Sequence, residues 1–177
     1  IHAAADVIKI HSGYETIKQN IAGTTNLLDN IISTKSQDAK MLYLSSGAIY
    51  GPLLNFNNGV EERYQNSNMD FLSSYGIGKI ISEKLFHEFY LKYPESSVAV
   101  ARCFAFSGPL LSLTSHLAFG NFIGNALDNN NIIIKGDGTP LRTYQYPTDL
   151  VRWLITLLIE VETYDVINVG GSQKISI

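Results

Sequence analysis

Short apolar runs alternate with segments of helical periodicity along the chain, and no other feature limits its fold as strongly. Apolar runs of strand length lie at residues 41–44, 98–104, 132–134 and 166–169. Apolar residues recur at helical spacing in the segments 14–32, 75–93, 117–127 and 148–159. Residues 1–5 are small and apolar, like the end of one further strand. Strands that alternate with helices form βαβ units, so we expect a parallel sheet with helices on both faces.

Polar and helix-breaking residues separate these elements. Pro94 is predicted to stop the helix before it, since proline cannot continue a helix. A polar, Asn-rich loop is expected over residues 52–73, and Gly136-Asp137-Gly138 is expected to turn. Thr148 and Asp149 are of the residue types that cap a helix N-terminus. Apolar residues after them, including Trp153, are expected in the core.

The composition excludes several functional classes. The chain has 177 residues, 45% of them hydrophobic, and a net charge of −3, which suits one domain with a sizeable core. No basic excess is available to neutralise nucleic-acid phosphates, so we predict no nucleic-acid partner. Cys103 is the only cysteine, which excludes an intrachain disulfide and a cysteine-based zinc site, and no metal is expected. No apolar run approaches the ~20 residues of a membrane span, and a cytoplasmic location is expected.

A serine, a tyrosine and a lysine form the most informative constellation. Tyr75 and Lys79 are four residues apart at the start of a predicted helix, so their side chains share one face. An ammonium beside a phenol lowers the phenol's pKa, and the tyrosine can then act as an acid or base. Ser46 follows a predicted strand, where its hydroxyl can orient a reacting oxygen. The alternative is a stabilising pair on an exposed helix. The order of strand, Ser-Ser-Gly, loop and Tyr-x-x-x-Lys favours catalysis.

Further segments fit one family in the same order along the chain. They are Ile1-His2-Ala3-Ala4-Ala5, Asn20 to Leu28 (Asn-x-x-Gly-Thr), Leu44 to Gly51 (Ser-Ser-x-x-x-Tyr-Gly), Arg102 to Pro109, and Gly136-Asp137-Gly138 with Arg142 and Asp149. Together with Tyr-x-x-x-Lys, they resemble the NAD-dependent epimerase/dehydratase family, also called extended short-chain dehydrogenases/reductases. Ser46 precedes Tyr75 by 29 residues, a long gap that is typical of this nucleotide-sugar-modifying branch.

The resemblance implies a fold and a division into domains. The expected fold class is α/β: a Rossmann-like doubly wound parallel sheet, partial because its N-terminal half is missing, with part of a smaller α/β substrate lobe. Residues 1–107 would form the C-terminal part of the NAD-binding Rossmann domain, including the catalytic Ser, Tyr and Lys. Residues 108–177 would form mainly the substrate-binding lobe, with returning Rossmann elements.

The resemblance also implies a role for each site residue. Tyr75 would remove a proton from a sugar hydroxyl while hydride passes to NAD, with NADP left open. Lys79 would hold the nicotinamide ribose, and Ser46 would orient the substrate oxygen. Arg142 would contact the phosphates of a nucleotide sugar, for which a guanidinium is well suited. The expected cofactor-binding set is Ala4, Ala5, Ser45, Tyr75 and Lys79. The helices after Asn20 and from Tyr75 imply a homodimer by analogy.

Three departures from the family's pattern refine these expectations. Ala105 stands where the family has an asparagine that contacts the substrate. Gly47 and Ala48 stand where 4,6-dehydratases have Asp-Glu, so dehydration by that route is hard to support. The sequence contains no Gly-x-x-Gly-x-x-Gly, the loop that seats the pyrophosphate at a helix N-terminus. We therefore expect an excerpt of a longer enzyme that by itself binds NAD weakly or not at all.

Three functions are compatible with these patterns. The first is a fragment of an NAD(P)-dependent nucleotide-sugar epimerase or reductase. The alternative is a nucleotide-sugar 4,6-dehydratase resembling dTDP-glucose 4,6-dehydratase, and a further alternative is a non-catalytic module with the NAD-binding fold. The presence of both Tyr75 and Lys79 favours an enzyme. His116 can reach a substrate only from the smaller lobe, and a solvated or packed histidine is the preferred interpretation.

Overall fold

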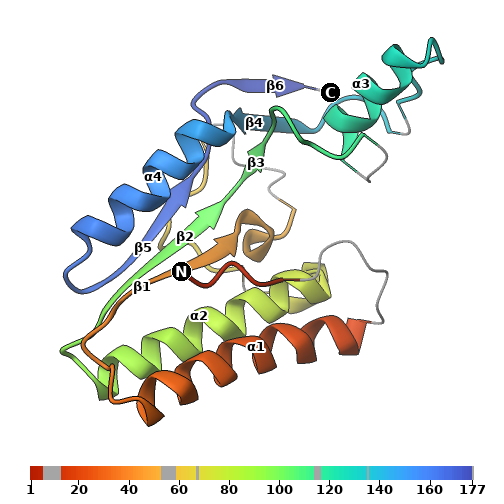
Figure 1. Cartoon of the computed structure of the whole chain (residues 1–177). Coiled ribbons are helices and arrows are strands. Elements are labelled where there is room, and N and C mark those ends of the chain that lie inside the picture. Colours follow the sequence, from red (N-terminus) through yellow and green to blue (C-terminus); the bar gives the residue numbers. More distant parts are fainter. Residues whose placement is uncertain (6–12, 53–58, 67, 114–116, 135, 177) are drawn as a thin grey trace. The chain divides into compact units, whose positions relative to one another are not determined.

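A computed structural model of the chain describes residues 1–5, 13–52, 59–66, 68–113, 117–134 and 136–176. These residues form two compact units. The first unit contains residues 1–103 and 153–169, and the second contains residues 104–152 and 170–177. Strands and helices alternate in the first unit around a parallel sheet (Figure 1), which confirms the α/β fold class.

The sheet of the first unit has three parallel strands in the order β1-β2-β5. Their bounds are Lys40–Ser46 for β1, Ser97–Cys103 for β2 and Tyr164–Val169 for β5. The strands end in register, with Ser46 beside Cys103 and Cys103 beside Val169. On the outer edge of β1, His2 forms a parallel bridge with Tyr43, as expected for a strand end. All three carboxyl ends therefore lie at one edge of the sheet.

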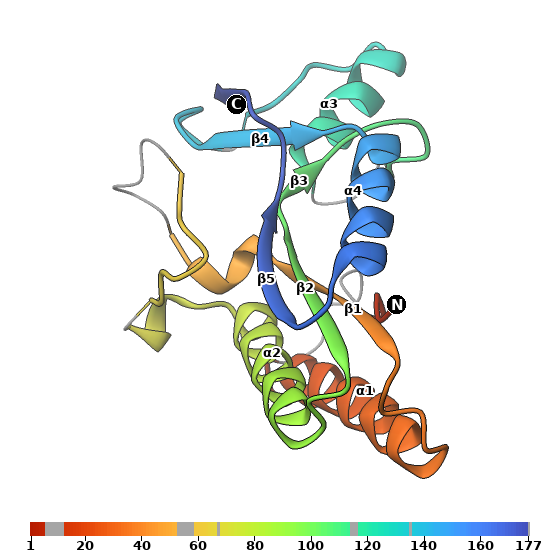
Figure 2. The same ribbon diagram turned by 90° about the vertical axis from the view of Figure 1, so that its left-hand side faces the viewer.

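Two long helices cover one face of this sheet. Helix α1 (Gly13–Ser33) and helix α2 (Ser74–Lys92) lie side by side in Figures 1 and 2. Ser73 caps α2 by accepting a hydrogen bond from the amide of Gly76 at 3.1 Å. The helix ends just before Pro94, as predicted. The part of α4 (Pro147–Glu160) that belongs to this unit lies on the opposite face.

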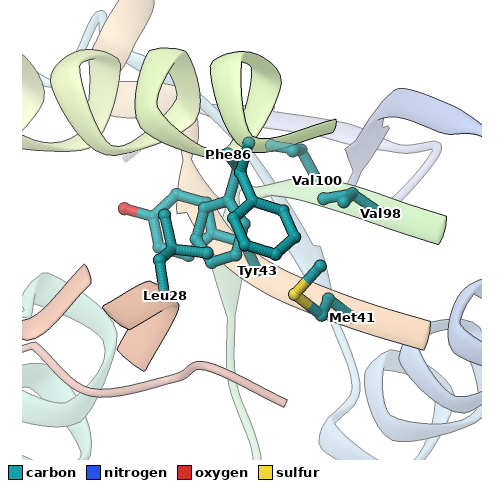
Figure 3. Close-up of a cluster of buried hydrophobic side chains, with 7 residues drawn as sticks. Leu28, Met41, Tyr43, Phe86, Val98 and Val100 are labelled. Atoms are coloured by element: carbon teal, nitrogen blue, oxygen red, sulfur yellow. The ribbon is translucent and has the colours of Figure 1, made fainter. Parts of the chain in front are cut away.

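The core of the first unit lies between the two helices and the sheet. Figure 3 shows the Tyr43 ring of β1 against the Phe86 ring of α2, with ring centroids 4.9 Å apart. Apolar side chains from α1, α2, β1 and β2 complete the cluster: Leu28, Met41, Tyr43, Phe86, Phe89, Val98 and Val100. Each fully buried side chain of this size contributes about 1.5–3 kcal/mol. This packing fixes α2 against β1, the two elements on which the predicted catalytic residues lie.

The second unit contains a smaller mixed sheet, helix α3 and the first part of α4. Strand β3 (Ala105–Phe106) is parallel to β4 (Leu141–Gln145), and β4 is antiparallel to β6 (Lys174–Ser176). Helix α3 spans Ala118–Leu127, close to the predicted segment.

The first unit also contains two short 3₁₀ helices between β1 and α2. They are η1 (Gly47–Tyr50) and η2 (Met69–Phe71).

Three sequence predictions differ from the structure. Residues 132–134 form no strand, because they are exposed and pair with no described strand. Helix α4 begins at Pro147, a residue preorganised for the first helical position, so Thr148 and Asp149 lie inside the first turn instead of capping it. Trp153 is 54% exposed and not in the core, because Leu154 is the residue that α4 buries. His116 lies outside the described residues.

Candidate active site

Ser46 and Tyr75 meet where β1 ends and α2 begins. Ser46 caps η1, and its hydroxyl oxygen accepts a hydrogen bond from the amide of Ala48 at 3.2 Å. Tyr75 lies in the first turn of α2 and is half-buried. The Ser46 hydroxyl lies close enough to the Tyr75 phenol to lower its pKa. The structure therefore brings together two residues that are 29 positions apart in the sequence.

A glycine allows this close approach. A Cβ atom on Gly76 would lie 2.7 Å from the carbonyl oxygen of Ala48, closer than real Cβ atoms come to other atoms. The first turn of α2 can therefore pack directly on η1 only if residue 76 has no side chain. Gly51, which follows η1, has a φ of +66°, in the left-handed region that favours glycine. Both glycines shape the backbone around Ser46.

Lys79 is a buried cation one helical turn after Tyr75. Its side chain is 2% exposed, and its ammonium donates a hydrogen bond to the carbonyl oxygen of Leu44 at 2.7 Å. The Lys79 Nζ atom lies 5.6 Å from the centroid of the Tyr75 ring. Burial lowers the pKa of Lys79 to about 8, although the neighbouring Cys103 and Glu83 raise it. The lysine therefore titrates close to the physiological range.

The pKa of Tyr75 differs from the sequence-based expectation. The sequence predicts that Lys79 lowers it, but burial raises the pKa of the phenol above its ordinary value, and the nearby Ser46 hydroxyl only counteracts this. The position of Lys79 explains why it does not lower the pKa of Tyr75. Its ammonium faces the ring of Tyr75 and donates its hydrogen bond to the carbonyl oxygen of Leu44. In the chain alone, the phenol is therefore a proton donor at neutral pH.

The structure adds a buried ion pair that the sequence analysis missed. Glu83 lies one turn after Lys79 on α2, and its carboxylate accepts hydrogen bonds from both Nε and Nη2 of Arg102 at the end of β2. The shortest of these contacts is 2.7 Å, and both side chains are nearly buried. Such bidentate pairs are strong and fix geometry. The signals that could have revealed the pair are an arginine in a strand of apolar residues and a glutamate four positions after Lys79.

This ion pair extends into a hydrogen-bond network. Nη1 of Arg102 donates to the hydroxyl of Tyr50 at 2.8 Å, and this hydroxyl donates to the side-chain oxygen of Asn168 at 2.7 Å. The side-chain amide of Asn168 donates to the carbonyl oxygen of Val60, and its backbone amide to the carboxylate of Glu62. The network therefore joins α2, the strand ends and the described part of the loop before Tyr75.

The predicted cofactor-binding residues lie in two different environments. Ala4 and Ala5 are exposed and follow His2, which forms a bridge with the outer edge of β1. Ser45 is buried, and its hydroxyl donates to the Glu83 carboxylate, so this side chain is occupied inside the first unit. Lys79 is as deeply buried as Ser45, whereas Tyr75 is half-buried at the start of α2.

Arg142 belongs to the second unit. It lies on β4 with an exposed side chain, and its guanidinium donates to the carbonyl oxygen of the adjacent Leu141 at 2.8 Å. Within the described ranges, no three His, Cys, Asp or Glu residues are placed to hold a metal ion. None of the described helices has both the length and the apolar character needed to cross a bilayer.

Comparisons with known proteins identify the family of the chain. The model of the "NAD dependent epimerase/dehydratase family" matches residues 1–170. UDP-glucuronic acid decarboxylase 4 from Arabidopsis thaliana is 30% identical over 174 residues, which are 96% of this chain and 38% of that protein. The chain thus spans well under half of the length of this relative.

Two solved structures have the same fold. UDP-glucuronic acid 4-epimerase from Bacillus cereus, in complex with NAD, superposes with a TM-score of 0.80 at 26% identity, over 99% of this chain and 54% of that one. dTDP-glucose 4,6-dehydratase from Bacillus anthracis has a TM-score of 0.81 at 24% identity, over 98% of this chain and 51% of that one. From the family model, the chain belongs to the NAD-dependent epimerase/dehydratase family.

Proposed function

We propose that this chain is part of a nucleotide-sugar epimerase or reductase in which Tyr75 exchanges a proton with a hydroxyl of the sugar. The observation that supports this most is the proximity of the Ser46 hydroxyl to the Tyr75 phenol at the carboxyl edge of a parallel sheet, with Lys79 beside the Tyr75 ring. Ligands of open α/β sheets bind at this edge. An acid/base group must lie within hydrogen-bond reach of the proton that it transfers, and Tyr75 is half-buried there.

The donor set fits the ribose end of a dinucleotide. The Lys79 ammonium has three donors, and within the described part of the chain it uses one on Leu44, which leaves two for ribose hydroxyls. The exposed Ala4 and Ala5 have side chains too small to obstruct a ligand. Bound NAD supplies a hydride acceptor for the carbon that bears the reacting hydroxyl. Ser46 would orient the substrate oxygen, and Tyr75 would take or return its proton.

A nucleotide sugar is the substrate class that we propose. The exposed Arg142 offers a guanidinium to the substrate's phosphates. The Bacillus cereus neighbour is named as an epimerase of UDP-glucuronic acid, a substrate of this class. We also propose a homodimer built on α1 and α2, by analogy with the family.

Decarboxylation of a nucleotide-linked uronic acid is the second candidate, because the relatives at about 30% identity are UDP-glucuronic acid decarboxylases. Oxidation of the hydroxyl on the carbon next to the one that bears the carboxylate yields a β-keto acid. Such an acid loses CO₂ without an added acid/base pair. Gly47 and Ala48, in η1 beside Ser46, have no ionisable side chain. They are therefore compatible with epimerisation, reduction or decarboxylation, and they argue against the dehydratase alternative.

Product analysis tests the proposed function. The longest protein expressed from the gene that encodes this sequence is incubated with NAD and either UDP-glucose or UDP-glucuronic acid, and ¹H NMR follows the sugar ring. Inversion at one ring carbon identifies an epimerase, loss of CO₂ a decarboxylase, and a 4-keto-6-deoxy product a dehydratase. We expect Tyr75→Phe to lower kcat by at least about 100-fold, since general acid/base catalysis contributes about that much.

Tyr90→Phe is the matched control for this test. Tyr90 lies on the same helix, four turns from Tyr75, and its ring contacts Tyr164 instead of the proposed site. We expect this variant to keep its activity. Full activity of Tyr75→Phe would overturn the proposed role of Tyr75, and the absence of any turnover of UDP-sugars by the unaltered protein would overturn the substrate class.

A further inference from the structure

The ring of Tyr43 lies directly beneath the Lys79 ammonium. The Nζ atom of Lys79 is 4.8 Å from the centroid of the Tyr43 ring, nearer than it is to the ring of Tyr75. A cation within about 6 Å of an aromatic ring face is attracted by the ring quadrupole, most strongly where water is excluded. Tyr43 is 1% exposed and Lys79 is 2% exposed, so this contact is desolvated.

Two neighbouring rings fix the orientation of Tyr43. The Phe86 ring stacks against it at 4.9 Å, as Figure 3 shows, and the His2 ring stacks at 5.5 Å. The Tyr43 hydroxyl is buried near Ser82 without a well-formed hydrogen bond among the described residues. The aromatic ring, and not the hydroxyl, is therefore the part of Tyr43 that contacts its surroundings favourably.

Little else compensates for the burial of the Lys79 charge. The titratable groups around it are Tyr75 and Glu83 on α2, Cys103 on β2 and His2 beside β1. Glu83 is already paired with Arg102, and the Cys103 thiol is neutral at pH 7 because burial raises its pKa to about 11. The Leu44 carbonyl supplies one hydrogen bond. The rings of Tyr43 and Tyr75 are the remaining electron-rich partners among the described residues, and the Tyr43 ring is the nearer of the two.

We propose that Tyr43 is a positioning residue for Lys79, whose aromatic face holds the lysine ammonium charged and in place beside Tyr75. The contact itself is independent of the proposed function, and only its consequence for Tyr75 rests on that function. Because the ring favours the ammonium over the neutral amine, its removal shifts the lysine toward deprotonation. The Lys79 side chain is then no longer held in the position in which it faces Tyr75.

NMR titration of Lys79 tests this proposal without any cofactor or substrate. The chain is labelled with ¹³C and ¹⁵N in its lysines, the Lys79 signal is assigned by its loss in Lys79→Met, and its pKa is read from the Cε shift. We expect Tyr43→Phe to leave the pKa of Lys79 nearly unchanged. Replacement of Tyr43 by a difluorophenylalanine keeps the shape and weakens the quadrupole, so we expect the pKa to fall by about half a unit or more.

Two controls keep the test decisive. Tyr93 caps the C-terminal end of α2, where its ring faces Lys92 at 5.2 Å, so Tyr93→Phe and Tyr93→difluorophenylalanine should leave the pKa of Lys79 equal. Tyr43→Leu removes the ring altogether, and circular dichroism shows whether that variant folds. An unchanged Lys79 pKa in the folded difluoro variant would overturn the proposal, and so would an increase. Because the fluorinated ring has nearly the size of phenylalanine, this result does not depend on the Leu variant.

Discussion

At the scale of single residues, the first unit keeps a positive charge where water is nearly absent. Lys79 is 2% exposed, and burial lowers its pKa from 10.5 to about 8. A hydrogen bond to Leu44 and the ring of Tyr43 hold the ammonium, but they do not cancel the cost of removing it from water. The protein therefore accepts a loss of stability at neutral pH to keep this lysine beside Tyr75.

The free energy of unfolding should consequently depend on pH in a defined direction. A lysine whose pKa is lower in the folded state loses its proton earlier there, so the unfolded state binds more protons between pH 8 and 10.5. Stability from this residue rises with pH in that window, by about 1 kcal/mol between pH 8 and pH 9. Urea unfolding of the unaltered chain and of Lys79→Met is measured at several pH values. The difference between the two curves of unfolding free energy against pH gives the contribution of Lys79.

The comparison is best confined to pH 7.5–9. Burial raises the pKa of Cys103 from 9.0 to about 11, and a raised pKa has the opposite effect, since stability is lost as the pH rises above 9. Subtracting the Lys79→Met curve removes this shared contribution to first order. If the difference stays constant across the window, Lys79 is not perturbed as described.

The Glu83–Arg102 ion pair should be far more important for stability than an exposed pair. Glu83→Gln keeps the shape of the side chain but leaves the Arg102 guanidinium buried without a counter-charge, and we expect a loss of about 3 kcal/mol. Lys84 and Glu88 form an exposed pair on the same helix at 2.7 Å. Glu88→Gln should therefore change the free energy of unfolding little. Urea denaturation compares the two variants, and equal losses would contradict this reading of the network.

Only part of the site is readable from the sequence at this scale. The order of Ser46, Tyr75 and Lys79 predicts their proximity, because a strand end and a helix start are local features with recognisable residues. The direction of the Tyr75 pKa shift is not predictable in this way, since it depends on how deeply the phenol is buried. The partnership of Glu83 with Arg102 likewise depends on which strand lies beside α2.

At the scale of elements, the contact of α2 with η1 decides the geometry of the site. The first turn of α2 contains Tyr75, and η1 follows Ser46 directly. Gly76 lies between them, with no room for a methyl group against the carbonyl of Ala48. The glycines within Tyr-x-x-x-Lys therefore have a packing role that the spacing of the motif does not reveal.

Gly76→Ala should destabilise the chain, although alanine is the better helix former. The new Cβ atom would force the α2–η1 contact apart, and overpacking of this kind costs about 1–3 kcal/mol. Gly23→Ala on α1 is the matched control, because its Cβ would meet its nearest neighbour, His2, at an ordinary 3.8 Å. We expect this control to stabilise the chain by about 0.5–1 kcal/mol. Opposite signs in urea denaturation support the packing argument, and a neutral Gly76→Ala contradicts it.

Elements were predictable where a long periodic segment had a partner. Helices α1 and α2 and strands β1, β2 and β5 lie where the apolar pattern predicts them, and each contributes to the packing of the first unit. The pattern does not predict the whole buried face of α2, which includes Lys79, Ser82 and Glu83. The apolar residues 132–134 fit a strand equally well but remain exposed and unpaired among the described strands. Trp153 likewise follows an apolar pattern without burial. An apolar run predicts a strand or a buried face only if another element covers it.

At the scale of the whole molecule, the chain contains two compact units with different contributions. The first unit contains Ser46, Tyr75 and Lys79, and the second contains the exposed Arg142. The same division is compatible with a reacting centre in the first unit and phosphate recognition in the second. The chain spans 38% of the length of the Arabidopsis thaliana decarboxylase and about half of the length of the two Bacillus structures. The complete activity is therefore a property to be tested on the longest available protein.

Affinity for NAD is the property in which the 177-residue chain should differ most from proteins that contain the glycine-rich pyrophosphate loop. The sequence offers Tyr75 and Lys79 to a ribose but contains no Gly-x-x-Gly-x-x-Gly to place backbone amides around a pyrophosphate. Two or three hydrogen bonds to one ribose support a dissociation constant of about 1 mM or weaker. Isothermal titration of the chain with NAD measures this constant, and Lys79→Met should abolish the residual binding. Saturable binding in the micromolar range would mean that other residues of this chain hold the phosphates, and would contradict the prediction.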